Sequence, residues 1–182
     1  LVVPSNTFVG RQIKAGAYLK IDKNQIPNYN NIDPQLLKLM NDVDAGNEYA
    51  VPYFWGINTI AINKDKVEKA LGGPLPDNQW DLLFKPEYSN KLKSCGISLW
   101  DSPSEIFPLV VKYIGKNPAD SNLDDLKAAA DVLKKVRPDI KRFSPSFIDE
   151  LARGDICVAV GNGGDMNMSK KRAEEVKNGV NI

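Results

Sequence analysis

Short apolar runs alternate with amphipathic segments along most of the chain. Buried strands are expected at Cys95–Trp100 and Asp155–Val160, because both are brief, nearly uninterrupted runs of apolar and small residues. Helices are predicted over Lys64–Leu71 and Leu123–Val136, where apolar residues recur at helical spacing. Strands that alternate with helices predict an α/β domain with a largely parallel sheet.

A longer β-rich run, Tyr49–Ile62, is interrupted by Pro52 and Gly56. It is long for one strand and is typical of a segment that leaves one sheet and enters another. We therefore expect a domain boundary inside it, with a compact α/β unit after it and a small part of another unit before it.

Both ends of the chain are apolar. Leu1–Val3 is interpreted as the tail of a buried strand, and Gly179–Ile182 as the start of another. A domain seldom begins inside one core strand and ends inside another. The pattern therefore indicates an internal piece of a longer polypeptide.

Composition removes several classes of function. Lys and Arg total 24 against 23 Asp and Glu, which leaves a formal charge of +1 and no broad basic footprint for nucleic acid. The chain has no His, which excludes His-based zinc sites and Ser-His-Asp catalysis. Two Cys residues cannot form a four-thiolate metal site. No stretch approaches the roughly 18 apolar residues of a membrane span. The residues imply no cofactor and no metal.

Two carboxylates follow the two predicted buried strands. Glu105 comes shortly after the first strand, and Asp165 closes the expected tight loop Gly161–Asp165 after the second. Ligands of open α/β sheets bind beyond the carboxyl ends of the strands, so neighbouring strands would bring both groups to one crevice. Neither loop holds a basic residue, which favours a cationic ligand. The alternative is helix capping, because acidic residues in a first helical turn complement the helix dipole.

The two Cys residues, Cys95 and Cys157, lie on these same two strands. A disulfide is feasible if the strands are adjacent and the compartment is oxidising. Two buried free thiols are the alternative, and the residues alone leave both open.

Seven segments, in order along the chain, together resemble the periplasmic polyamine-binding proteins, particularly the putrescine-binding receptors of ABC transporters. They are Leu1–Ser5, Leu36–Leu39, Val51–Gly56, Asn63–Val67, Leu92–Ser98, Gly154–Gly161 and Ala173–Val180. The resemblance implies an α/β, periplasmic binding protein-like class II fold with two lobes. Residues 1–50 would be part of the first lobe. Residues 51–182 would be a nearly complete second lobe with the hinge crossover at its start.

The same resemblance implies a solute-binding receptor, not an enzyme. It would capture putrescine or a related polyamine in the periplasm and deliver it to an ABC permease, without cofactor, nucleic acid or membrane insertion. Ser5 corresponds to a polar first-lobe contact, and Glu105 and Asp165 to acidic groups that hold ammonium ions. Asn162 stands where similar receptors have Trp, and offers hydrogen bonds in place of an aromatic face. The resemblance also favours a Cys95–Cys157 disulfide.

Two other classes of function are considered. One is an α/β enzyme that uses Glu105 or Asp165 as a general acid or base. The absence of His, of a nucleophile motif and of a metal cluster counts against it. The other is a fragment that binds no ligand by itself.

Overall fold

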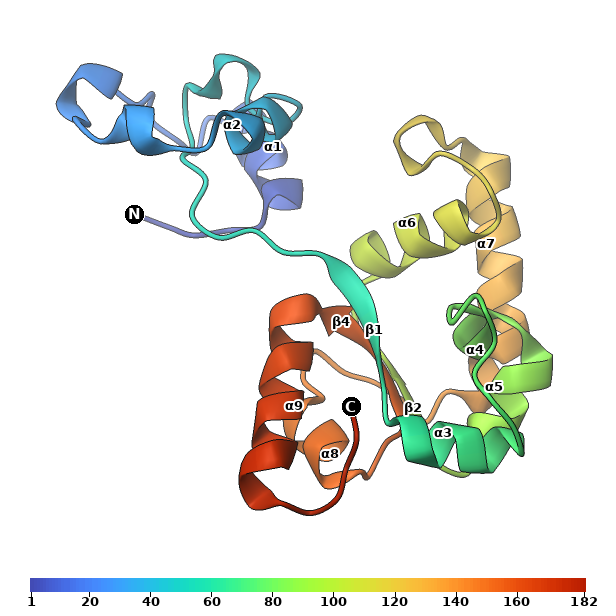
Figure 1. Cartoon of the computed structure of the whole chain (residues 1–182). Coiled ribbons are helices and arrows are strands. Elements are labelled where there is room, and N and C mark those ends of the chain that lie inside the picture. Colours follow the sequence, from blue (N-terminus) through green and yellow to red (C-terminus); the bar gives the residue numbers. More distant parts are fainter. The chain divides into compact units, whose positions relative to one another are not determined.

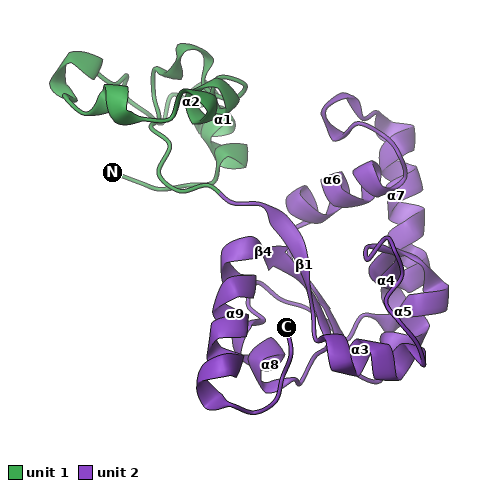
Figure 2. Ribbon diagram, viewed as in Figure 1, with its two compact units in different colours: residues 1–55 green, residues 56–182 purple.

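The computed structural model describes all 182 residues and divides them into two compact units, Leu1–Trp55 and Gly56–Ile182 (Figure 2). The division falls inside the run Tyr49–Ile62, a few residues after the expected boundary at Val51. We describe the units separately as unit 1 and unit 2. Their assignment to receptor lobes stays a prediction.

Unit 1 contains two short α-helices, α1 (Asn6–Lys14) and α2 (Pro34–Met40), with 3-10 turns at Lys23–Gln25, Tyr29–Asn31 and Ala45–Asn47. Among its residues only Val9 and Asp44 are buried, so it has almost no apolar core of its own. The Asp44 carboxylate accepts hydrogen bonds from the backbone N–H groups of Glu48, Tyr49 and Ala50. This buried acid therefore orders the chain just before the division between the units.

Unit 2 is built on a four-stranded sheet. Its strands are β1 (Asn58–Ile62), β2 (Ile97–Leu99), β3 (Arg142–Phe143) and β4 (Val158–Asn162), in the order β1-β4-β2-β3 (Figure 1). The β4–β2 and β2–β3 pairs are parallel, whereas β1 runs antiparallel to β4. The expected largely parallel sheet is thus confirmed for three strands, and β1 is the exception.

Helices cover both faces of this sheet (Figure 1). They are α3 (Lys64–Leu71), α4 (Asp81–Phe84), α5 (Pro86–Leu92), α6 (Pro103–Tyr113), α7 (Leu123–Val136), α8 (Ile148–Arg153) and α9 (Gly163–Val176), with 3-10 turns at Pro118–Asp120 and Arg137–Asp139. Val158 and Val160 join the larger core, which is formed with α3 to α7. Ala159 joins a smaller core with α8 and α9. Alternate side chains of β4 therefore serve opposite faces, as the strand period requires.

Local capping explains several helix boundaries. The Asn63 side chain accepts from Lys66 N–H at the start of α3, and Gly72 ends that helix in the left-handed conformation, at φ 73°. Asn122 and Asp125 form a reciprocal capping box at the start of α7. The predicted bounds of α3 and α7 are confirmed. None of the helices has both the length and the apolar character needed to cross a bilayer.

The structure differs from the strands and loops expected at four segments. Leu1–Val3 and Gly179–Ile182 are not strands, and no neighbouring strand pairs with either segment. The stretch from Tyr49 to Ile57 is also not a strand, because the β1–β4 ladder ends where Asn58 meets Asn162. The expected loop Gly161–Asp165 does not exist, since β4 extends to Asn162 and α9 begins at Gly163.

Candidate functional site

Glu105 lies in the first turn of α6, which begins directly after the loop that follows β2. The side chain is half-buried. Its Oε2 accepts a hydrogen bond from the Asn58 side-chain amide at 2.5 Å. A carboxylate has about four lone-pair sites, so this contact leaves acceptor capacity for an incoming donor.

Asp165 lies in the first turn of α9, directly after β4, and is also half-buried. Its backbone carbonyl accepts from Ser169 Oγ at 2.9 Å. Because β2 and β4 are parallel neighbours, the helices that follow them start at the same edge of the sheet. The sequence predicted a shared crevice on the condition that the two strands are neighbours, and the structure meets that condition.

Neither carboxylate is neutralised by a basic side chain. Ten ion pairs occur in the chain, and neither Glu105 nor Asp165 takes part in one of them. Neither carboxylate accepts a hydrogen bond from the backbone of its helix, and the N-cap side chains, Ser102 and Asn162, make no cap hydrogen bond either. Their first-turn positions still complement the helix dipoles. The two carboxylates therefore have no basic partner at this edge of the sheet.

Asn162 is the last residue of β4 and is exposed. It pairs in register with Asn58 at the start of β1. Directly paired residues of an antiparallel ladder carry their side chains on the same face. Asn58 therefore pairs with Asn162 in the ladder and contacts Glu105 through its side chain, and it is a candidate site residue that the sequence did not single out. The signal it offered was one amide in the otherwise largely apolar segment from Gly56 to Ile62.

Ser5 belongs to unit 1, where it precedes α1. It is exposed, and its Oγ lies 2.9 Å from Thr7 Oγ1. Its hydroxyl makes no cap hydrogen bond to the helix backbone. The Ser5 hydroxyl is thus accessible to a ligand.

Cys95 and Cys157 form a disulfide, with their Cα atoms 5.5 Å apart. The separation fits the usual range for such a bond. Cys157 is fully buried beside β4, and Cys95 is half-buried ahead of β2. The disulfide expected from the resemblance is confirmed, and it joins the segments directly before β2 and β4, the parallel strands that precede Glu105 and Asp165.

Solved structures with this arrangement are periplasmic binding proteins. PotD of Streptococcus pneumoniae, a spermidine/putrescine ABC transporter substrate-binding protein, is 24% identical with a TM-score of 0.71, over 94% of this chain and 49% of that one. The TpPotD lipoprotein of Treponema pallidum is 25% identical with a TM-score of 0.74, over 94% of this chain and 51% of that one. The α/β periplasmic binding protein fold is therefore shown.

The family follows from the sequence match. The model of the bacterial extracellular solute-binding proteins matches residues 2–178, and the chain belongs to that family. The putrescine-binding periplasmic protein SpuD of Pseudomonas aeruginosa (strain UCBPP-PA14) is 48% identical over 183 residues, covering 100% of this chain and 50% of the relative. The putrescine-binding periplasmic protein PotF of Escherichia coli (strain K12) is 47% identical over 184 residues, with the same coverage. The chain spans about half the length of the curated relatives it matches.

Proposed function

We propose that this chain is part of a solute-binding receptor that captures putrescine or a related polyamine in the periplasm and delivers it to an ABC permease. The names of the relatives supply the ligand class and the compartment. The protein acts by binding and release and not as an enzyme.

The observation that carries the proposal is the pair of unneutralised carboxylates at one edge of the sheet. Glu105 and Asp165 begin the helices after two parallel neighbouring strands and have no basic partner. A polyamine presents ammonium groups joined by methylenes, and each ammonium gains a charge-assisted hydrogen bond from a carboxylate. In this proposal Glu105 and Asp165 hold ammonium groups, while Asn162 and Ser5 supply polar contacts.

The remaining parts of the proposal concern closure and environment. The segment at Tyr49–Ile62 would act as the hinge, so that ligand capture is followed by closure of two lobes. The Cys95–Cys157 disulfide is consistent with an oxidising compartment such as the periplasm.

The test uses a chimera in which the 182 residues replace the matching segment of the Pseudomonas aeruginosa relative. Titration calorimetry would measure putrescine binding by the chimera and by its Glu105→Gln and Asp165→Asn variants. Each change keeps the size of the group and removes its charge. We expect each to weaken binding by roughly 2–5 kcal/mol, because a desolvated ammonium loses its charged partner.

Matched controls neutralise exposed carboxylates elsewhere in unit 2. Glu87→Gln on α5 and Glu174→Gln on α9 should leave the affinity unchanged. Unchanged affinity for putrescine in the Glu105 and Asp165 variants would contradict the proposal. So would a sharp fall in the melting temperature of the unliganded variants, since that result would identify the two carboxylates as stabilisers of their helices. The 182-residue chain without the flanking segments should bind putrescine far more weakly than the chimera.

A further inference from the structure

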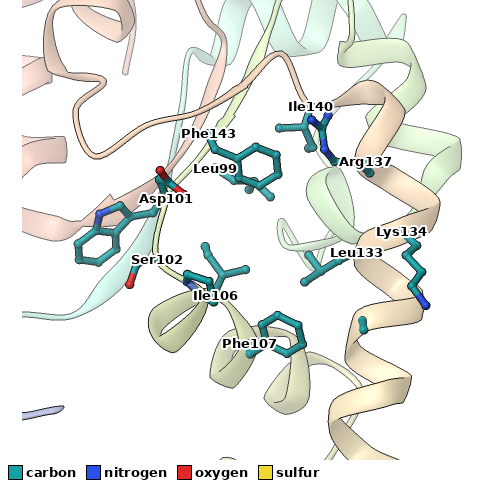
Figure 3. Close-up of a pocket in the computed structure, with 13 residues that line it drawn as sticks. Leu99, Asp101, Ser102, Ile106, Phe107, Leu133, Lys134, Arg137, Ile140 and Phe143 are labelled. Atoms are coloured by element: carbon teal, nitrogen blue, oxygen red, sulfur yellow. The ribbon is translucent and has the colours of Figure 1, made fainter. Parts of the chain in front are cut away.

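A cavity of about 380 Å³ lies between α6 and α7 (Figure 3). Its walls are largely apolar, with Leu99 from β2, Ile106 and Phe107 from α6, Leu133 from α7 and Phe143 from β3. Neither Glu105 nor Asp165 lines it. Cavities of roughly 300–1,000 Å³ with apolar walls and few polar groups are typical of small-molecule sites.

Of the two basic residues that line this cavity, one forms an ion pair and the other does not. Lys134 forms an ion pair with Asp131 at 3.1 Å. Arg137 has no carboxylate partner, and its guanidinium lies 5.0 Å from the centroid of the Phe143 ring. Asp101 lies on the opposite side of the cavity from Arg137 and Lys134, and it is exposed to solvent (Figure 3). Arg137 is itself exposed to solvent, so the α7 side of the cavity presents a cation without a carboxylate partner at the rim of an apolar interior.

We propose that this cavity is a second binding site, for a small amphipathic carboxylate. The apolar body would fill the space between α6 and α7, and the carboxylate would pair with Arg137, whose planar fork matches carboxylate geometry. A polyamine does not suit this site, because Asp101 is the one carboxylate that lines it and is exposed to solvent, whereas Arg137 repels ammonium. The inference is independent of the proposed polyamine function.

Three probes with the same phenylbutyl group but different end groups measure how much the charge of the end group contributes to binding. They are 4-phenylbutyrate, 4-phenylbutanol and 4-phenylbutylamine, each titrated into the 182-residue chain and followed by the NMR signal of the Trp100 indole N–H, since Trp100 lines the cavity. We expect saturable binding of 4-phenylbutyrate with a dissociation constant of about 1 mM or below. The alcohol should bind roughly tenfold more weakly and the amine more weakly still.

Two kinds of variant locate the site. Arg137→Gln should lower the affinity for 4-phenylbutyrate to that of the alcohol and leave the alcohol unaffected. Ala130→Trp fills the cavity from α7 and should abolish binding, whereas Ala128→Trp on the exposed side of the same helix should not. The proposal is overturned if no probe saturates, if the amine binds best, or if Arg137→Gln leaves carboxylate binding intact. The Arg137 result decides the matter even if Ala130→Trp fails to fold.

Discussion

Asn58 shows how one side chain determines the direction in which another points. Its amide donates to Glu105 across 47 positions of sequence, and it pairs with Asn162 across the β1–β4 ladder. Glu105 and Asp165 could be selected from the sequence because each follows a predicted strand. Asn58 could not be selected, since its role depends on the antiparallel register of β1, which no local pattern specifies.

We expect Asn58→Leu to weaken putrescine binding by the chimera by about tenfold, because Glu105 loses the donor that orients it. In the Glu105→Gln background the same change should have little further effect, since the charged group is already absent. Calorimetry on the four proteins of this double-mutant cycle measures the coupling. Equal losses in both backgrounds would show that Asn58 acts independently of Glu105.

A second polar contact, at Asp81, concerns stability. The side chain is mostly buried, and it accepts hydrogen bonds from Lys85 Nζ and Tyr113 Oη, each at 2.7 Å. Burial opposes ionisation of Asp81, but the hydrogen bonds from Lys85 and Tyr113 outweigh it and hold the pKa of Asp81 below its ordinary value. Burial, together with the Asp81 carboxylate, raises the pKa of Tyr113.

A depressed carboxyl pKa stabilises the fold above the unfolded value of about 3.9, and that contribution is lost as pH falls through the folded value. Tyr113→Phe should therefore lower the free energy of unfolding at pH 7 by roughly 1–3 kcal/mol. The deficit should shrink at a strongly acidic pH, below the depressed pKa of Asp81 in the folded state, where the folded carboxyl becomes protonated. Urea unfolding at both pH values measures it, with the exposed Tyr53→Phe as control. A deficit of constant size at both pH values would contradict the role given to the ionised carboxylate.

At the scale of elements, long periodic segments were the most predictable. The helices α3 and α7 have apolar residues at clear helical spacing, and each is preceded by an N-cap residue, Asn63 or Asn122. The strand β3 was missed because it has only two residues, Arg142 and Phe143, and exists through its pairing with β2. The junction of β4 and α9 was expected to be a loop because glycine-rich segments usually are.

Gly161 illustrates why glycine is needed at that junction. A Cβ added there would overlap the ring of the buried Phe147, whose Cζ would lie 2.9 Å away. At Gly164, the second residue of α9, an added Cβ meets nothing within 4 Å. A side chain is therefore excluded at Gly161 but has room at Gly164, and the sequence does not distinguish these two glycines.

Gly161→Ala should lower the free energy of unfolding by about 1–3 kcal/mol, because Phe147 must move within a packed core. Gly164→Ala should instead stabilise the chain by up to about 1 kcal/mol, since Ala favours the helix. Paired urea denaturation curves test the difference. Equal effects of the two substitutions would rule out the contact with Phe147 as the cause.

At the scale of the whole molecule, the two units differ in what stabilises them. Unit 2 has cores on both faces of its sheet, whereas unit 1 buries a single apolar residue, Val9. The sequence indicated the place of division through the mixed run Tyr49–Ile62. The sequence could not indicate that unit 1 has almost no buried core, because apolar residues such as Leu39 and Phe8 are present there but remain exposed.

The disulfide should be a major stabiliser of unit 2. Its two Cys residues are 62 positions apart, and closing a loop of that length in the unfolded chain corresponds to about 4 kcal/mol. The double variant Cys95→Ala/Cys157→Ala should therefore unfold at lower urea concentration, with a loss of roughly 2–5 kcal/mol. Reductant should destabilise the original chain and leave the double variant unaffected. Coincident unfolding curves under oxidising conditions would contradict this.

The direct passage from β4 into α9 restricts how this edge of the sheet can evolve. A one-residue insertion after Asn162 would turn every side chain of the following helix by about 100° and would carry Asp165 away from its present direction. We therefore expect substitutions at this junction to be tolerated better than insertions or deletions. The connection from α6 to α7 contains no strand, and we expect it to tolerate changes in length. Ligand preference at the carboxylate edge would then diversify by point substitution, with Asn162 as the most accessible position.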